Sequence, residues 1–203
     1  MLYFTIGLPR CGKSTWANKW VRFEADIEKC DKYEGHLQFC NRPHDFRRLR
    51  FDENPRAVVN EDAIRFAVTG KRFTFKVEPI AEAITHAMIS SYVAQGYDVL
   101  VDETHTTWKS IEALLWIDPN AKPIWIYRPK YEVETDYSSQ WPEIVDDGWK
   151  AHVELCCQRA LETNQQDLVD VIKYRHAIQI EQLVYKFNEE FQDRAQYALE
   201  NKQ

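Results

Sequence analysis

The sequence lacks the features that would direct it to a membrane, to an oxidising compartment or broadly onto nucleic acid. Its 203 residues contain no run of about eighteen apolar residues, so no membrane-spanning helix is expected. Its five cysteines are an odd number, which argues against a disulfide scaffold and favours a reducing, cytoplasmic environment. The 26 lysines and arginines face 32 aspartates and glutamates, a net charge of −6. Any contact with nucleic acid must therefore be local.

Internal repeats, low-complexity linkers and a signal-peptide pattern are absent as well. The composition, 44% hydrophobic and 29% charged, is globular and sufficient for one domain with a buried core. Short apolar runs alternate with longer helical stretches, which predicts an α/β fold: a parallel sheet of four to five strands with helices on both faces. Strands are expected at 2–6, 57–60, 97–102, 124–127 and, as the fifth, 170–174. Helices are expected at 13–23, from 62, at 79–95, 107–117 and 149–163, and in a last segment that carries Ile180, Leu183, Val184, Phe187 and Phe191.

A glycine-containing turn directly follows the first expected strand. Residues 7–15 read GLPRCGKST and satisfy the pattern GxxxxGK[ST] in full, between a strand and a helix. Glycines such as Gly7 and Gly12 let backbone N–H groups turn inward toward phosphate oxygens, and the helix N-terminus adds positive potential. Lys13 supplies a point charge for the β- and γ-phosphates, and the Ser14 hydroxyl is a ligand for Mg²⁺, with Thr15 beside it. The turn predicts a nucleoside triphosphate site.

Two acidic groups follow the next strands, where ligands bind in parallel sheets. Asp62 and Arg65 lie three residues apart and share a face at the start of a helix. There the carboxylate can take the proton of an attacking hydroxyl while the guanidinium holds a phosphoryl group. The alternative is an aspartate that stabilises a helix N-terminus beside a surface arginine. Asp102 ends the apolar run VLV and is expected either to hold Mg²⁺, directly or through water, or to orient Arg65 and the acceptor. Continued strand alternation would point Glu103 elsewhere.

The blocks TIGLPRCGKSTWA, VVNEDAIR and VLVDETH resemble the kinase domain of bacteriophage-type polynucleotide 5′-kinases. The wider relatives are small P-loop kinases that include the zeta-toxin group, and the resemblance covers roughly residues 3–128 in separated blocks. It implies a P-loop kinase-like fold, ATP and Mg²⁺ as cofactors, and γ-phosphoryl transfer to a hydroxyl, in the host cytoplasm if the protein is viral. By resemblance Asp62 is the general base, Arg65 the acceptor or phosphoryl clamp, and Asp102 the acidic partner near both. Arg175 or His176 would then border the adenine.

The chain departs from that family at three places. Forty-nine positions separate Lys13 from Asp62, so residues 25–56, which look irregular, polar and arginine-rich, are expected to be an insertion. The family's lid after the fourth strand usually carries arginines, but residues 129–150 hold none. The residue that takes the role of the lid arginine is left open among Arg128, Lys130, Lys150 and Arg159. No DxDGT-type phosphatase signature follows, which argues against a kinase–phosphatase fusion.

The insertion and a second basic–aromatic stretch, residues 71–76, are candidates for contact with nucleic acid. Arginines contact phosphates and aromatic rings stack on unpaired bases, although a solvated loop packed by its phenylalanines is nearly as compatible with the pattern. The arginines concerned are Arg42, Arg47, Arg48, Arg50 and Arg56. The same insertion contains Cys30, His36, Cys40 and His44, whose spacing is not a standard zinc pattern, so scattered structural roles are favoured over zinc.

The sequence therefore predicts an ATP- and Mg²⁺-dependent kinase with an alcohol acceptor. The leading acceptor is a polynucleotide, through a 5′-OH end or a hydroxymethyl group on a DNA base. One alternative is a small-molecule kinase for a nucleoside, nucleotide or sugar nucleotide, which the net negative charge favours and the arginine–phenylalanine insertion disfavours. The other is a nucleotide-binding ATPase or regulator, against which Asp62 and Arg65 argue.

Overall fold

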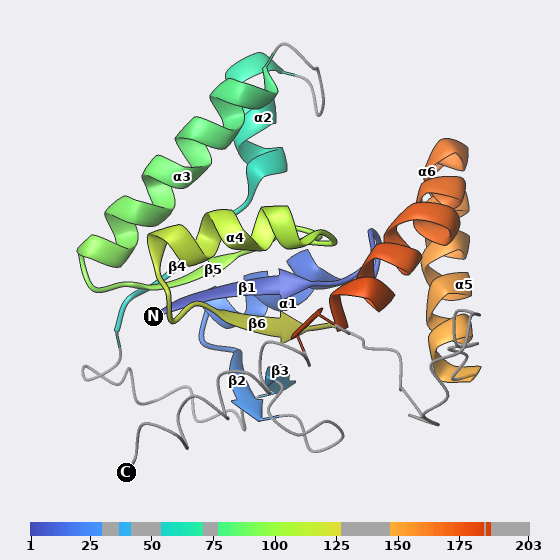
Figure 1. The fold of residues 1–203 in the computed structure, drawn as a ribbon, viewed down its shortest axis with the longest axis horizontal. Helices are drawn as coiled ribbons and strands as arrows, with labels where there is room; N and C mark the ends of the chain where they lie inside the picture. The colour runs from blue at the N-terminus through green and yellow to red at the C-terminus, as the bar shows by residue number, and fades with distance from the viewer. Residues whose placement is uncertain (30–36, 42–53, 71–76, 127–146, 185, 188–203) are drawn as a thin grey trace. The chain divides into compact units, whose positions relative to one another are not determined.

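The computed structural model describes residues 1–29, 37–41, 54–70, 77–126, 147–184 and 186–187 (Figure 1). The chain divides into two compact units. The first consists of Met1–Gly7, Gly12–His105 and Lys109–Ile126, and it contains the whole sheet. The second consists of Leu8–Cys11, Thr106–Trp108 and the chain from Tyr127 onward.

The sheet has six strands in the described part of the chain, in the order β2-β3-β6-β1-β5-β4. The four strands β6, β1, β5 and β4 are parallel to one another, as is β3 to β6, and β2 pairs antiparallel with β3. The α/β prediction is confirmed, but the expected count of four to five strands and a wholly parallel sheet are wrong. The strands are β1 (Leu2–Ile6), β2 (Ala25–Lys29), β3 (Leu37–Asn41), β4 (Arg56–Val59), β5 (Asp98–Val101) and β6 (Lys122–Trp125).

The extra strands come from the segment that looked irregular. In β2 and β3 apolar and polar residues alternate over only five positions each, so one face of the hairpin is apolar. Ile27 and Phe39 pair across the hairpin and pack against a cluster formed by Ala17, Trp20, Leu100 and Ile124. The expectation that 25–56 is irregular is therefore wrong for 25–29 and 37–41, which form strands.

Helix α1 (Lys13–Val21) provides the centre of that cluster. Its Trp20 is 2% exposed and meets the ring of Tyr3 of β1 edge-on at 6.2 Å. Because α1 contacts both β2 and β4, the two edge strands, the sheet curls around this helix. The orientation of the helix that begins at the glycine turn is thereby fixed by the core.

Arg56 contributes to this packing and does not project as a ligand for nucleic acid. Its guanidinium donates to the backbone oxygens of Trp20 and Ala25 at 3.0 and 3.1 Å and pairs with Asp26 at 3.1 Å. It also lies over the rings of Trp20 and Phe23. Its side chain is 8% exposed, so the expectation that Arg56 belongs to a binding surface is wrong.

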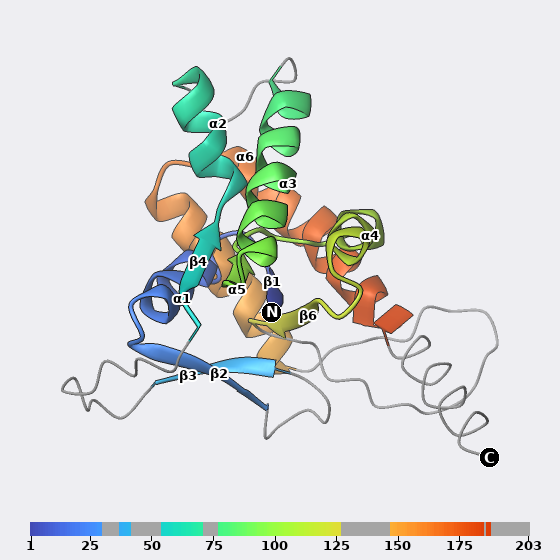
Figure 2. The same ribbon diagram turned by 90° about the vertical axis from the view of Figure 1, so that its left-hand side faces the viewer.

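The opposite face of the sheet is covered by other helices of the first unit. Figure 2 shows α1 on one side, and α3 (Glu78–Ala94) and α4 (Trp108–Ile117) on the other. Helix α3 packs against β5 and β4 and buries Ala81, Thr85 and Ile89. The shorter α2 (Glu61–Thr69) packs against α3 and ends at Gly70, whose φ of 68° is the left-handed conformation that terminates helices.

The described part of the second unit from residue 147 onward is mainly helical. It contains α5 (Asp147–Glu162), α6 (Gln166–Val171) and a π-helical turn, η1 (Ile172–His176), and the helix continues to residue 184. The expected fifth strand at 170–174 is therefore wrong, because Val169, Ile172 and Ile180 are buried along one helix. Within this unit Arg10 binds Gln165 and Thr163 through its guanidinium. None of the described helices has both the length and the apolar character needed to cross a bilayer.

Candidate active site

The carboxyl ends of β1, β5 and β4 lie next to one another in the sheet, because these strands are parallel neighbours in that order. The chain leaves β1 into α1 on one face and leaves β5 toward α4 on the other face (Figure 2). Neighbouring parallel strands whose following helices lie on opposite faces create a crevice, and ligands bind there in open α/β sheets. The predicted site residues of the first unit follow these three strands.

The first part of the site is the start of α1. Gly12 adopts φ +99°, the left-handed conformation that glycine tolerates, and no described side chain caps the helix that it begins. The uncapped N–H groups of a helix start are ready to bind an anion. Lys13 is 8% exposed and donates from Nζ to the Gly7 carbonyl oxygen at 3.1 Å, whereas Ser14 and Thr15 are exposed. The lysine is thus held inside its own turn.

Three contacts fasten the segment after β5 to the end of β1. The Thr5 hydroxyl donates to the Glu103 carbonyl oxygen at 2.7 Å. The Gly7 N–H donates to the Thr104 oxygen at 3.2 Å. The His105 ring bonds the Thr5 carbonyl oxygen at 2.9 Å, and since a carbonyl only accepts, Nδ1 carries the proton. Residues 102–105 are therefore positioned by the strand that leads into the glycine turn.

Asp102 is the buried acid of this segment. It is 4% exposed, and its Oδ2 accepts a hydrogen bond from Asn60 Nδ2 at 3.0 Å. Its other oxygen, Oδ1, is buried without a hydrogen-bond partner in the described part of the chain. A buried carboxylate oxygen is costly to leave unpaired, and a cation or a water bound to a cation would satisfy it. Asp102 and the exposed Ser14 hydroxyl therefore fit Mg²⁺, which typically takes one or two protein oxygens and completes its shell with water and phosphate.

Asn60 connects Asp102 to the next strand. It caps α2, because its Oδ1 accepts from the Ala63 N–H at 2.8 Å. Its Nδ2 also donates to the Asp102 carbonyl oxygen at 2.9 Å. One amide group thus fixes the start of α2 against the end of β5.

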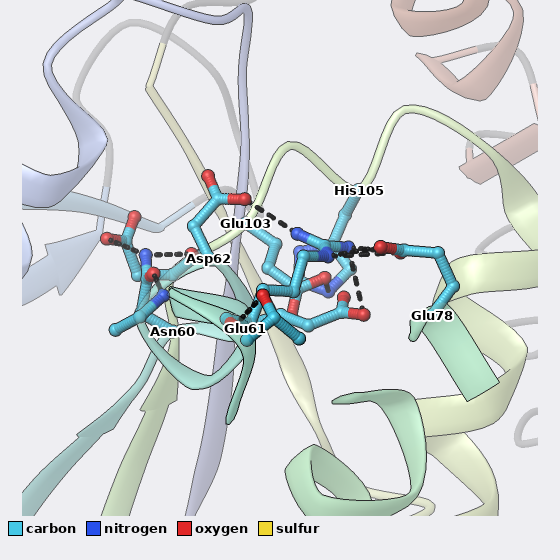
Figure 3. A network of polar contacts seen from close by, with 10 residues as sticks. Asn60, Glu61, Asp62, Glu78, Glu103 and His105 are labelled. Atoms are coloured by element: carbon cyan, nitrogen blue, oxygen red, sulfur yellow. Dashed lines mark hydrogen bonds and ion pairs between the residues drawn. The ribbon is translucent and has the colours of Figure 1, made fainter. Parts of the chain in front are cut away.

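The guanidinium of Arg65 binds three carboxylates, those of Glu61, Asp62 and Glu78, which Figure 3 labels. Glu78, at the start of α3, binds it as a fork: Nε lies 2.8 Å from Oε1 and Nη2 lies 2.8 Å from Oε2. Nη2 also pairs with Glu61 at 2.9 Å, and Nη1 donates to Asp62 Oδ1 at 2.6 Å. The Asp62 side chain is 72% exposed, whereas that of Arg65 is 16% exposed. The mostly buried arginine holds the three carboxylates in place, and the aspartate projects outward.

Glu61 and Glu103, both labelled in Figure 3, form a carboxyl pair, and the charge of Arg65 acts on both. Burial, followed by the charge of Glu103, raises the pKa of Glu61 to about 7, and the two side chains share a hydrogen bond. Burial likewise raises the pKa of Glu103 to about 7, while the positive charge of Arg65 opposes that shift. Two such coupled carboxyls titrate as a unit, and the pair retains a proton up to about neutral pH.

Substitution of Glu61 by glutamine is expected to change how stability depends on pH. The folded state holds the Glu61 proton more tightly than the unfolded state, so this group's contribution is complete below pH 4.5 and is lost as pH rises through about 7. The free energy of unfolding should therefore fall less between pH 5 and pH 8 in Glu61→Gln than in the wild type. Urea unfolding at both pH values measures the difference, with the exposed carboxyl variant Glu82→Gln as control. Equal falls in wild type and Glu61→Gln would contradict the buried pair.

His105 connects the acidic cluster to the glycine turn. Burial, together with the positive charge of Lys13, lowers the pKa of His105 to about 4, while the hydrogen bond to Thr5 and the charge of Asp102 oppose that shift, so the ring is neutral at physiological pH. Its Nε2 lies 3.8 Å from Glu103 Oε2, too far for a hydrogen bond. The charges of two predicted site residues, Lys13 and Asp102, both act on this ring.

The structure brings part of the predicted site together. The charges of Lys13 and Asp102 both act on the His105 ring, and the charges of Asp62 and Arg65 both act on Glu103, the residue after Asp102. Arg175 is exposed on η1 in the second unit and does not follow a strand, contrary to expectation. The remaining predicted ligands lie outside the described residues: Arg42, Arg47, Arg48, Arg50 and Arg128, together with residues 129–146 of the expected lid, whose last residues belong to α5.

Four site residues were not found from the sequence, namely Asn60, Glu61, Glu78 and Glu103. Glu61 is four residues before Arg65, a spacing that predicts a helical ion pair, and Asn60 precedes a helix as a capping residue does. Glu103 was expected to point elsewhere, but β5 ends at Val101 and strand alternation does not reach it. Glu78 carries no local signal, since it is thirteen residues from Arg65.

The cysteine–histidine spacing finds no support in the described residues, among which no three His, Cys, Asp or Glu side chains gather as metal ligands. Cys30, His36 and His44 lie outside them. Cys40 is described, and its Sγ contacts the Asp26 carbonyl oxygen at 3.7 Å.

Comparisons with known proteins give a fold but no family. No protein-family model matches the sequence, and no curated protein matches it. Among solved structures, the chain is similar to one in the Pnkp1/Rnl/Hen1 RNA repair complex, with 14% identity and a TM-score of 0.55 over 91% of this chain and 45% of that one. A chain of a Pnkp1/Rnl/Hen1 complex also matches, with 15% identity and a TM-score of 0.44 over 71% of this chain and 42% of that one. This chain thus spans less than half the length of either.

Proposed function

We propose that this protein is a P-loop kinase that transfers the γ-phosphoryl group of ATP to a hydroxyl on a nucleic-acid acceptor. The observation that carries the proposal is the arrangement at three adjacent strand ends. The glycine turn with Lys13 follows β1. Asp102, whose Oδ1 has no hydrogen-bond partner in the described part of the chain, follows β5, and the outward-facing Asp62 follows β4. A phosphate site, a cation ligand and a base on one sheet edge are what transfer to an alcohol requires.

The proposed reaction needs little covalent chemistry from the protein. The acceptor oxygen attacks the γ-phosphorus of ATP, a new O–P bond forms, and the bond from the γ-phosphorus to the bridging oxygen of ADP breaks. The hydroxyl proton passes to the exposed Oδ2 of Asp62, while Oδ1 is held by Arg65. Lys13 neutralises charge on the phosphates, and the turn orients them. Mg²⁺, held by Asp102 and Ser14, would offset the charge that develops on the phosphate oxygens.

Two observations support a nucleic-acid acceptor, one from the fold and one from the sequence. The fold resembles that of a chain in an RNA repair complex, and the sequence contains clustered arginines with interleaved phenylalanines. Arginines of this kind contact phosphates, and the rings stack on bases. Arg128 and Arg175 remain proposed contacts of the nucleotide, and Arg42, Arg47, Arg48 and Arg50 of the acceptor.

Transfer from labelled ATP onto a panel of acceptors tests the proposal. The panel contains 5′-OH DNA and RNA, DNA with hydroxymethylpyrimidines, and free nucleosides. We expect Mg²⁺-dependent label on at least one alcohol acceptor, because the site supplies a base and a phosphate cradle together. Label in inorganic phosphate alone would support a nucleotide-binding ATPase instead and would refute the kinase proposal.

Salt dependence separates a polymeric acceptor from a small molecule. Each phosphate contact to a polymer releases counterions, so the acceptor affinity should fall steeply as salt rises. A nucleoside acceptor gives a shallow slope and would favour the small-molecule kinase.

A further inference from the structure

The guanidinium of Arg65 is almost fully used by carboxylates of its own chain. It has five N–H bonds in a fixed plane. Those of Nε and Nη2 are directed to Glu78 and Glu61, and one of Nη1 is directed to Asp62. Only the second N–H of Nη1 has no partner within the described part of the chain.

This use of the guanidinium restricts what Arg65 can offer to a substrate. Arginine recognises a phosphate best as a fork, through two parallel N–H bonds. The fork of Arg65 is already occupied by Glu78, whose carboxylate lies 2.8 Å from both Nε and Nη2. A substrate phosphate would have to displace that partly buried carboxylate and would then lie beside it as a like charge.

The net charge around Arg65 also disfavours a substrate phosphate. Asp62 and Glu78 alone outnumber the single charge of Arg65, even when Glu61 holds its proton. Asp62 and Arg65 together offer a substrate one hydrogen-bond acceptor, Asp62 Oδ2, and one donor, the remaining Nη1 N–H of Arg65. Such a pair matches an alcohol, which donates its proton to the carboxylate and accepts a bond from the guanidinium.

We infer that the acceptor site at Asp62 selects a neutral alcohol with no phosphate beside it, and that Glu78 is the residue that determines this selectivity. The inference rests on the proposed function and narrows its acceptor. Of the two polynucleotide hydroxyls considered above, a hydroxymethyl group on a base fits, since it projects away from the backbone phosphates. A 5′-OH end fits less well, since its sugar carries a phosphate on the 3′ oxygen.

One matched pair of acceptors tests the inference. The nucleoside 5-hydroxymethyl-2′-deoxycytidine carries both candidate alcohols, and its 3′-monophosphate differs only by the added phosphate. For the wild-type protein we expect label on the hydroxymethyl oxygen of both compounds. We expect kcat/KM for transfer to the 5′-OH to be about 10- to 100-fold higher in the nucleoside than in the 3′-monophosphate, the range of one charge-assisted hydrogen bond lost or opposed. Glu78→Gln should reduce that ratio toward one or reverse it, because the guanidinium fork becomes available to the phosphate.

Two further variants serve as controls for Glu78→Gln. Glu82→Gln alters an exposed glutamate one turn along α3 and should leave the ratio unchanged. Glu78→Asp keeps the negative charge and should retain the preference for the nucleoside even where it lowers the rate. A wild-type protein that transfers to the 5′-OH of the 3′-monophosphate equally well or better overturns the inference, and so does a ratio that Glu78→Gln leaves unchanged.

Calorimetric binding of the same two compounds, with a non-hydrolysable ATP analogue present, separates failure of the inference from failure of the proposed function. Tighter binding of the nucleoside without any transfer would retain the selective site and refute the kinase. Transfer to the 3′-monophosphate in preference to the nucleoside would retain the kinase and refute the selectivity. Binding of neither compound would refute the inference.

Discussion

Replacement of Asp62 by asparagine is expected to lower phosphoryl transfer by about 10²- to 10⁴-fold, the range typical of a general base. Asparagine keeps the size of the side chain and one oxygen for Arg65 Nη1, but it cannot take a proton from the acceptor. ATP binding should be unchanged, because Asp62 is 72% exposed and belongs to a different strand end from the glycine turn. Single-turnover transfer and ATP binding by calorimetry measure the two effects separately.

The matched control for this substitution is Asp167→Asn. Asp167 is also an exposed aspartate in the first turn of a helix, α6, so both variants lose the same stabilising interaction with a helix N-terminus. Asp167→Asn should transfer phosphate at the wild-type rate. Full activity in Asp62→Asn would show that another group is the base.

Replacement of Lys13 by alanine should abolish most transfer by a different route. The ammonium is the charge that the turn holds inside itself, 3.1 Å from the Gly7 oxygen, and phosphates that enter the turn lose their main counter-charge without it. Loss of one such electrostatic contact costs about 10²- to 10³-fold in kcat. Unlike Asp62→Asn, Lys13→Ala should also weaken ATP binding.

Lys19→Ala provides the control on the same helix. Lys19 lies in the last turn of α1, with its Nζ 4.9 Å from the centroid of the Trp16 ring, so its loss tests the stability of the helix without touching the turn. Lys19→Ala should bind and use ATP normally. Unimpaired ATP binding and transfer in Lys13→Ala would refute the triphosphate site.

The central strands and most helices could be predicted from the sequence because their patterns are local. The apolar runs of β1, β4, β5 and β6 and the helix that starts after Gly12 lie where the sequence indicates. The β2–β3 hairpin was not predicted for two reasons. Its apolar face becomes evident only from its packing against α1, and an alternation of five residues is a weak signal among charged residues. The segment 170–174 was misread because β-branched Val171 and Ile172 favour strands locally, whereas burial continues at helical spacing to Ile180.

The site shows the same division between local and tertiary information. The glycine turn, Asp62 and Asp102 carry signals within a few residues. The partner that controls Arg65 does not, because Glu78 reaches it only through the packing of α2 against α3. The sequence therefore predicted that Arg65 binds a phosphoryl group or the acceptor, because it did not reveal the carboxylates that surround the guanidinium.

Asn60 joins two requirements in a single amide. Its oxygen completes the first turn of a helix and its nitrogen steadies a neighbouring acid, so a substitution that keeps one of these tasks can still lose the other. Aspartate would retain the helix cap yet set one carboxylate against another, and serine would cap the helix without reaching the acid. Evolutionary drift at this position is thereby confined: a change tolerated for folding still disturbs the chemistry, and the reverse holds too.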